Sequence, residues 1–209
     1  MSLYKNFNNF LNIDMIKIYY GMSGALKNQT ILKESPPDYK IMKSAIKPWK
    51  SLESGPLHNL IVPGDLNFAA LHLIRLRDWK DFCGDKLIVE RGITDFLFFH
   101  FRSQQYHPGK TLEMDISLIK NLVKEENQIL SDKCEKILLI QRDPNFVRDK
   151  VFEDPYRKAT FSGDLNLYLR MQEEYIQFTK TWNNITREVV IENAKEYIEE
   201  TLKQEYQND

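Results

Sequence analysis

Residues that could bind a phosphate cluster in one short stretch of the chain. An apolar run at 15–20 is followed by Gly21 and Gly24, and then by Lys27. The run predicts a short buried strand that ends in a glycine-bearing turn, with a helix starting after it. Glycines let backbone N–H groups converge on an anion, the helix N-terminus adds partial positive charge, and a lysine reaches the outer phosphates. A phosphate-binding loop is therefore predicted here. Its expected members are Gly21, Ser23, Gly24, Ala25, Lys27, Asn28 and Thr30.

The loop departs at two places from the standard pattern G-x-x-x-x-G-K-[ST]. Leu26 stands where the second glycine belongs, and Asn28 stands where a Mg²⁺-binding hydroxyl belongs. A second interpretation therefore stays open, namely an ordinary strand-turn-helix corner with a solvated surface lysine.

Two opposite charges end the strand predicted at 86–92. Glu90 and Arg91 follow the apolar run directly. The end of a buried strand is an expensive place for charges unless they pair with each other or meet a ligand. A site role and a structural ion pair at the sheet edge are both open. Arg142 similarly ends the strand predicted at 136–142.

Five short apolar strands alternate with helical stretches along the chain. The strands are predicted at 15–20, 39–46, 86–92, 136–142 and 188–191. The helices are predicted at 26–34, 57–82, 95–105, 111–131, 164–182 and 192–204. This alternation indicates an α/β protein, a three-layer sandwich in which helices cover both faces of a five-stranded parallel sheet. Ligands of such sheets bind beyond the carboxyl ends of the strands, which is where the loop and the charged residues fall.

Composition limits the class of protein further. The 209 residues are enough for one domain with a sizeable core, and 42% hydrophobic and 12% aromatic residues indicate a folded chain. The 29 basic and 30 acidic residues leave a net charge of −1, which gives no argument for polyanion binding. Cys83 and Cys134 show no metal or disulfide spacing and are expected as free thiols in a reducing compartment. We expect no membrane span and no export signal, and hence a cytoplasmic protein.

Taken together, four passages resemble the P-loop kinases of nucleosides and nucleotides, in particular the thymidylate kinase and deoxynucleoside kinase group with its phage-type members. The first is the loop at 21–30, a degenerate version of the phosphate-binding motif. The second is the helical passage at 66–71, and the third is the acidic-Arg passage at 89–95. The fourth runs from 142 to 158 and is placed like a basic lid. Their order covers the chain from about 15 to 205.

The resemblance implies a single domain over 1–209, with a lid at about 142–163, ATP and Mg²⁺ as cofactors, and roles for particular residues. Catalytic roles are implied for Lys27, Glu90, Arg91, Arg142, Arg148 and Arg157. Substrate contacts are implied for Trp49, Phe68, His72, Arg75 and Arg91. Metal contacts are implied for Asn28 and Glu90.

Two departures from the family pattern affect these roles. Thymidylate kinases carry an arginine for the acceptor phosphate where Leu71 and His72 stand here, and Arg75 comes one turn later. Deoxynucleoside kinases place a general-base glutamate at the end of strand two, and this chain has none there. The acceptor could therefore be a nucleoside or a monophosphate, and no general base is assigned.

Two functions of different classes follow from the resemblance. The first is ATP-dependent phosphoryl transfer to a nucleoside or nucleoside monophosphate. The alternative is a catalytically impaired nucleotide-binding or regulatory protein, which Leu26 and Asn28 favour. The expected partner is a small-molecule nucleoside or nucleotide. The near-zero net charge argues against nucleic acid, no membrane partner is expected, and a homodimer stays open.

Overall fold

The computed structural model describes residues 15–22, 24–43, 64–98, 116–130, 134–155, 158 and 161–205. At 64–68 and 204–205 only the backbone is described. Ser23, Trp49 and Arg157, for which site roles are expected, lie outside the described residues, and so does the side chain of Phe68.

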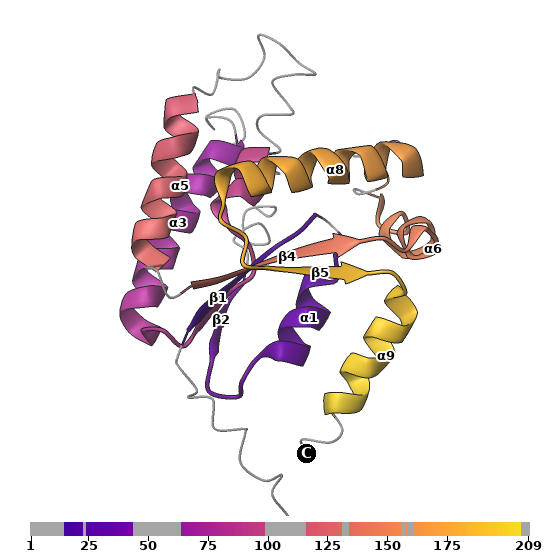
Figure 1. Cartoon of the computed structure of the whole chain (residues 1–209), viewed down its shortest axis with the longest axis horizontal. Coiled ribbons are helices and arrows are strands. Elements are labelled where there is room, and N and C mark those ends of the chain that lie inside the picture. Colours follow the sequence, from indigo (N-terminus) through magenta and orange to yellow (C-terminus); the bar gives the residue numbers. More distant parts are fainter. Residues whose placement is uncertain are drawn as a thin grey trace, which may run out of the picture.

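Five parallel strands form one sheet (Figure 1). Their order in space is β2-β3-β1-β4-β5, so β1 lies at the centre between β3 and β4. The prediction of a five-stranded parallel sheet is confirmed. The strands are β1 (Ile16–Tyr20), β2 (Lys40–Met42), β3 (Leu87–Val89), β4 (Cys134–Gln141) and β5 (Arg187–Ile191).

Helices cover both faces of the sheet. In the described parts of the chain they are α1 (Lys27–Glu34), α3 (Gly64–Cys83), α5 (Ile116–Leu130), α6 (Pro144–Phe146), the π-helical turn η2 (Val147–Val151), α8 (Leu165–Trp182) and α9 (Ala194–Glu205). Residues 93–98 are also helical. α1 and α9 lie on one face, while α3, α5 and α8 lie on the other (Figure 1).

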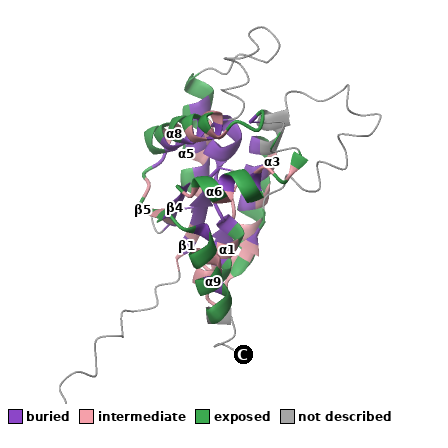
Figure 2. Cartoon of the chain, turned by 90° about the vertical axis from the view of Figure 1, so that its right-hand side faces the viewer, coloured by how far each residue is buried: buried purple, intermediate pink, exposed green. Residues whose placement is uncertain are grey.

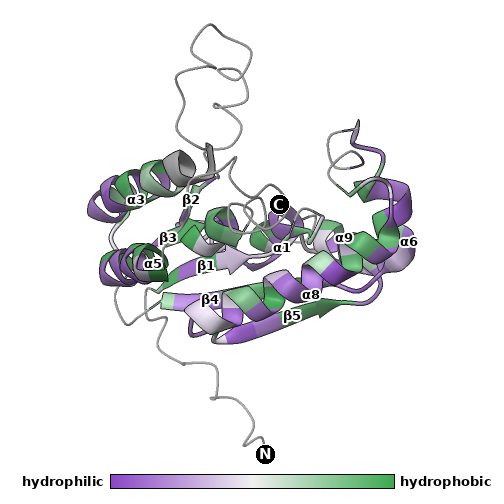
Figure 3. Cartoon of the chain, turned by 90° about the horizontal axis from the view of Figure 1, so that it is seen from above, coloured by the Kyte–Doolittle hydropathy of each residue, from purple (hydrophilic) through white to green (hydrophobic). Residues whose placement is uncertain are grey.

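The central strand is buried on both faces, as its continuous apolar run requires. Ile16, Ile18 and Tyr20 pack toward α3, α5 and α8, whereas Tyr19 packs toward α1 with Ile31. Figure 2 shows the buried strands enclosed by helices that expose their outer sides. Figure 3 shows hydrophobic and hydrophilic residues side by side along α5 and α8, as expected of helices with one buried face. The core therefore holds the carboxyl ends of β1, β3 and β4 at one edge of the sheet.

Gly92, just after β3, packs directly on the ring of Tyr20. A Cβ added at Gly92 would lie 1.9 Å from Tyr20 Cε1. We expect Gly92→Ala to lower the free energy of unfolding by about 3 kcal/mol, because the ring or the backbone must move. Urea unfolding monitored by circular dichroism measures this loss.

Gly84→Ala is the matched control. Gly84 has a φ of +61° but nothing within 4 Å of an added Cβ, so only backbone strain of about 1 kcal/mol is expected. Equal losses in the two variants would contradict the close contact between Gly92 and Tyr20.

Candidate functional site

The sheet topology selects one place for a ligand. The chain leaves β1 toward β2 on one side of the sheet and leaves β4 toward β5 on the other side. In open α/β sheets, a crevice forms beyond the carboxyl ends of two neighbouring strands whose connections diverge in this way. The loop at 21–26 follows β1, and 142–143 follow β4. The predicted phosphate-binding loop therefore lies at the topological switch point.

The loop turns tightly into α1. The backbone N–H of Ala25 donates to the carbonyl of Met22 at 3.1 Å, and Gly24 has a φ of +91°. Leu26 adopts the left-handed conformation, with φ 53° and ψ 32°, immediately before α1 begins. This is a conformation that glycine adopts without penalty, whereas another L-residue pays about 1–2 kcal/mol. Leu26 thus takes a glycine-like backbone at the very position where the standard pattern has glycine.

Burial of its side chain offsets the strain at Leu26. The side chain is 8% exposed and packs with Ile191 and Ala194, at the junction of β5 and α9. Burying a leucine side chain contributes about 1.5–3 kcal/mol, which is enough to offset the left-handed backbone. The departure from glycine in the sequence is therefore compatible with the loop geometry.

Lys27 points into the protein rather than into solvent. It is the first residue of α1 and is 7% exposed. Its Nζ donates to the carbonyl of Met22 at 3.0 Å and also to the carbonyl of Gly21. A buried ammonium requires such acceptors, because desolvation of an unpaired charge is costly. The alternative of a solvated surface lysine does not describe this geometry.

A second charged group approaches Lys27 from the neighbouring strand. Arg91 follows β3, and its Nη1 lies 3.8 Å from Oδ2 of Asp95. Asp95 is 1% exposed and accepts a hydrogen bond from the hydroxyl of Tyr175 on its Oδ1. Burial raises the pKa of Asp95, and the positive charges of Lys27 and Arg91 oppose this rise. The loop lysine and the pair after β3 therefore act on one another electrostatically.

Within the part of the chain that the structure describes, two atoms of this cluster have no hydrogen-bond partner. They are Nε of Arg91 and Oδ2 of Asp95, both of which are buried. Buried polar atoms are rarely left unpaired, since each costs about 1–3 kcal/mol. The open donor and the open acceptor belong to residues that form one ion pair, so a ligand group able to accept from one and donate to the other would complete both.

The end of β4 is tied to the loop by a buried glutamine. Gln141 Nε2 donates to the carbonyl of Gly24 at 3.4 Å. Its backbone N–H donates to Gln172 Oε1 at 3.0 Å, and Gln172 Nε2 donates back to the Gln141 carbonyl at 2.8 Å. α8 thereby fixes the strand end, and the strand end supports the loop.

The segment expected as a lid packs closely on the loop at Gly24. A Cβ added at Gly24 would lie 2.5 Å from Cγ2 of Val151 in η2. Arg142 pairs with Glu173 of α8 at 2.5 Å, and Arg148 Nη1 donates to Asn145 Oδ1 at 3.4 Å. Both of these lid arginines thus contact neighbouring protein groups, and the packed contact with the loop is made by Val151.

The remaining site residues take varied positions. Asn28 is exposed on the first turn of α1, and Arg75 and Glu90 are half-buried. Thr30 is fully buried, where its hydroxyl donates to the Leu26 carbonyl at 3.0 Å and accepts from Tyr197 at 3.0 Å. His72 is 4% exposed and its Nε2 lies 2.9 Å from Glu126 Oε1. The Thr30 hydroxyl and His72 Nε2 are thus engaged inside the protein, as Lys27 Nζ is, and the ligand contacts expected of Thr30 and His72 stay predictions.

Several residues of this region were not among the predicted ones. Asp95 could have been noticed, because it follows Arg91 by four residues and such a pair shares one side of a helix turn. In the sequence, Tyr175 and Gln172 fall at the spacing of the buried side of α8, and Glu126 is one of several charged residues of α5. Their partners lie far away in sequence, so no local pattern could have found them.

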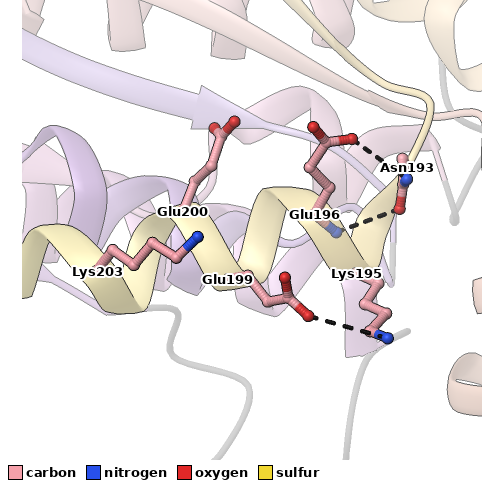
Figure 4. A pocket seen from close by; sticks show the side chains of 6 residues that line it. All are labelled: Asn193, Lys195, Glu196, Glu199, Glu200 and Lys203. Atoms are coloured by element: carbon pink, nitrogen blue, oxygen red, sulfur yellow. Dashed lines mark hydrogen bonds and ion pairs between the residues drawn. The ribbon is translucent and has the colours of Figure 1, made fainter.

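A shallow hollow on the surface of α9 is a weaker candidate (Figure 4). Its lining is polar and comes only from α9 and the residue before it: Asn193, Lys195, Glu196, Glu199, Glu200 and Lys203. Asn193 Oδ1 accepts from the backbone N–H of Glu196 at 3.2 Å, and Lys195 Nζ lies 4.0 Å from Glu199 Oε1. These contacts are those of a helix cap and a solvated helix face, so we assign the hollow no ligand.

Comparisons with known proteins give limited further information. No protein-family model matches the chain, and no curated protein matches it either. Among solved structures, the chain is similar to the YorR protein from Bacillus subtilis, described in complex with phosphorylated GDP. The two are 13% identical with a TM-score of 0.47, over 93% of this chain and 97% of that one. At this degree of likeness we draw no argument about function from it.

Within the described residues, no group of three or more His, Cys, Asp or Glu side chains is arranged to hold a metal ion. None of the described helices combines the length and apolar character needed to cross a membrane.

Asp143 joins the end of β4 to two helices. Its Oδ1 accepts from the backbone N–H groups of Asn145 and Phe146, and its Oδ2 accepts from that of Ala194, each at 3.0 Å. The hydrogen bond from Phe146, followed by those from Ala194 and Asn145, holds the pKa of Asp143 below its ordinary value against the opposing effect of burial.

We expect Asp143→Ala to lower the free energy of unfolding by about 1–2 kcal/mol at pH 7, because two helices lose a cap. Since the folded pKa lies below the unfolded value of about 3.9, this contribution is fully present above that value and is lost as pH falls through the folded pKa. Denaturant unfolding between pH 7 and about pH 3 measures the gap between wild type and variant. A gap that does not shrink toward low pH would contradict this role of the carboxylate.

Proposed function

We propose that this protein binds ATP at the loop after β1 and transfers its γ-phosphoryl group to a nucleoside or nucleoside monophosphate. One observation carries the proposal: Lys27 is buried at the switch point of the sheet and lies within electrostatic reach of the Arg91–Asp95 pair after β3. Phosphoryl transfer asks a protein mainly for positioning and charge stabilisation, and these are what buried, oriented cations supply.

Lys27 is the proposed ligand of the outer phosphates of ATP. Its ammonium is held inside the loop by the carbonyls of Gly21 and Met22, which leaves little side-chain entropy to lose on binding. Charged phosphate oxygens are stronger acceptors than neutral carbonyls, so an exchange of partners is favourable. The N-terminus of α1 begins at the same residue and adds partial positive charge.

Mg²⁺ is the proposed metal, and the residues present suit it. Mg²⁺ takes oxygen ligands and is usually bound by one or two carboxylates together with substrate phosphates and water. Glu90 after β3 and the exposed Asn28 on α1 offer a carboxylate and an amide oxygen. When bound, Mg²⁺ would neutralise charge on the phosphates.

Arg91 is the proposed contact to the acceptor. Its Nε lacks a partner, as does Oδ2 of Asp95 beside it, so the pair offers one donor and one acceptor together. A sugar or base edge carrying both kinds of group would satisfy them. The contact between Gly24 and Val151 further supports a lid at about 142–163, because a nucleotide in the loop would press on η2.

Lys27→Met tests the proposal. We expect the apparent Kd for ATP to rise at least about tenfold and phosphoryl transfer to fall by about a hundredfold or more, because the variant loses a positioned charge on the transferred group. Isothermal titration with ATP, and phosphoryl transfer against a panel of nucleosides and monophosphates, measure these effects.

Lys195→Met is the matched control, since Lys195 is 86% exposed on α9 and the same charge is removed from a solvated helix face. The control is expected to behave as wild type. Unchanged ATP affinity and rate in Lys27→Met would overturn the proposal, as would a wild type that binds ATP but phosphorylates no acceptor.

A second candidate function is nucleotide binding without turnover. Asn28 in place of the metal-binding hydroxyl, and Lys27 bonded to carbonyls of its own loop, favour it. Thermal unfolding with ATP separates the two candidates. A larger rise in Tm with Mg²⁺ than without it favours the kinase, whereas a metal-independent rise with no transfer favours the binding protein.

A further inference from the structure

A second group of buried polar residues lies behind the site, between the sheet and the helices α3 and α5. Glu126 of α5 is 0% exposed, and the neighbouring His72 of α3 is 4% exposed. His72 Nε2 lies 2.9 Å from Glu126 Oε1, and the hydroxyl of Tyr20 donates to Glu126 Oε2 at 3.3 Å. Neither residue belongs to the loop or contacts Lys27 by any described hydrogen bond.

The Glu126 carboxylate also reaches the turn that follows β3. The backbone N–H of Ile93 donates to Glu126 Oε1 at 2.7 Å. Ile93 opens the helical residues 93–98, so the carboxylate sits on one of the N–H groups that a helix start leaves without an internal partner. Arg91 lies two residues before this contact and Asp95 two residues after it.

Each residue of the turn at 92–95 is held by a different part of the protein. Gly92 packs on the ring of Tyr20, and Thr94 Oγ1 accepts from Nδ2 of Asn183 at 2.9 Å. Asp95 accepts from the hydroxyl of Tyr175. Among these contacts, the one to Ile93 is made by a buried carboxylate, which binds a backbone N–H more strongly than a neutral acceptor does.

Burial of Glu126 is difficult to explain by stability alone. A buried carboxylate together with its polar partner is often no more stabilising than apolar side chains of similar size. What Glu126 does that an apolar residue could not do is accept from Ile93 and so fix the backbone between Arg91 and Asp95. A fixed backbone in turn fixes the distance between Nε of Arg91 and Oδ2 of Asp95, the donor and the acceptor that lack partners.

We infer that Glu126, oriented by His72, is a positioning residue that sets the Arg91–Asp95 pair for the acceptor substrate. The inference rests on the proposed function for the identity of the substrate. It goes beyond that function because it makes the affinity for the acceptor, but not the affinity for ATP, depend on Glu126, a residue that contacts neither proposed ligand. Loss of the Ile93 contact loosens the turn after β3, whereas the hydrogen bonds from Lys27 Nζ to the carbonyls of Gly21 and Met22 do not involve Glu126.

Glu126→Met is the principal test, because it keeps the length of the side chain and removes the acceptor. We expect KM for the acceptor to rise at least about tenfold while the Kd for ATP stays within about twofold. Hydrogen exchange read by mass spectrometry is expected to increase in the peptide spanning 91–98 more than in peptides from β1 or β4. Glu126→Gln keeps an oxygen for Ile93 and is expected to restore most of the acceptor KM.

Glu125→Met is the matched control, since Glu125 is the preceding residue of α5 and its exposed carboxylate pairs with Arg77 on the surface. It is expected to leave KM, ATP affinity and local exchange unchanged. If Glu126→Met does not fold, Glu126→Asp withdraws the carboxylate from Ile93 by one methylene while keeping the charge, and a smaller rise in acceptor KM is expected.

Three results would overturn the inference: exchange raised equally throughout the chain, a Gln variant as impaired as the Met variant, or an equal loss of ATP and acceptor affinity. Failure of the proposed function is distinguishable from these. If the wild type transfers no phosphoryl group, the proposed kinase activity is wrong. Hydrogen exchange at 91–98 and the equilibrium binding of nucleosides, compared between wild type and Glu126→Met, then still test the positioning role of Glu126.

Discussion

A buried ammonium group is the constraint on which this edge of the sheet depends. Carbonyl oxygens of the loop accept hydrogen bonds from Lys27 Nζ, and together with the nearby carboxyl of Asp95 they compensate the hydration that a buried ammonium loses. The loop must therefore curl back on itself, and the turn after β3 must come close. Both conditions are met at the carboxyl ends of adjacent strands, because β1 and β3 pair in register at Ile18 and Val89.

The two halves of the site are held by different physical means. The loop after β1 is shaped mainly by its backbone. Leu26 and Gly24 adopt positive φ angles, and the buried side chain of Leu26 holds the loop against β5 and α9. The turn after β3 is held by side chains: Glu126 accepts a hydrogen bond from it, and Asn183 and Tyr175 donate to it. A backbone loop can adjust to a ligand at small cost, whereas a turn held by buried hydrogen bonds keeps one geometry.

Most of the fold could be predicted from the sequence because the inner strands β1, β3 and β4 are largely apolar runs, which is the signature of a strand buried on both faces. The helix expected at 164–182 is confirmed, and the structure shows the Asp164 carboxylate accepting from the backbone N–H of Asn166 at its start. Strand ends were less predictable: β4 begins at Cys134, before the expected Lys136, because Cys134 and Glu135 pair with β1. The partners of Asp95 could not be predicted, since Tyr175 is 80 residues away.

The two opposite charges after β3, Arg91 and Asp95, are poorly matched to each other. Arg91 and Asp95 face each other at 3.8 Å, longer than a good charge-assisted hydrogen bond, and each keeps one buried polar atom without a partner. The attraction within such a pair offsets little of the free energy lost on its desolvation. With apolar side chains in the same places, the fold would often be at least as stable. The arrangement is therefore incomplete as a structural ion pair. A group that accepts from Nε of Arg91 and donates to Oδ2 of Asp95 would complete it, which is what the proposed contact to the acceptor requires.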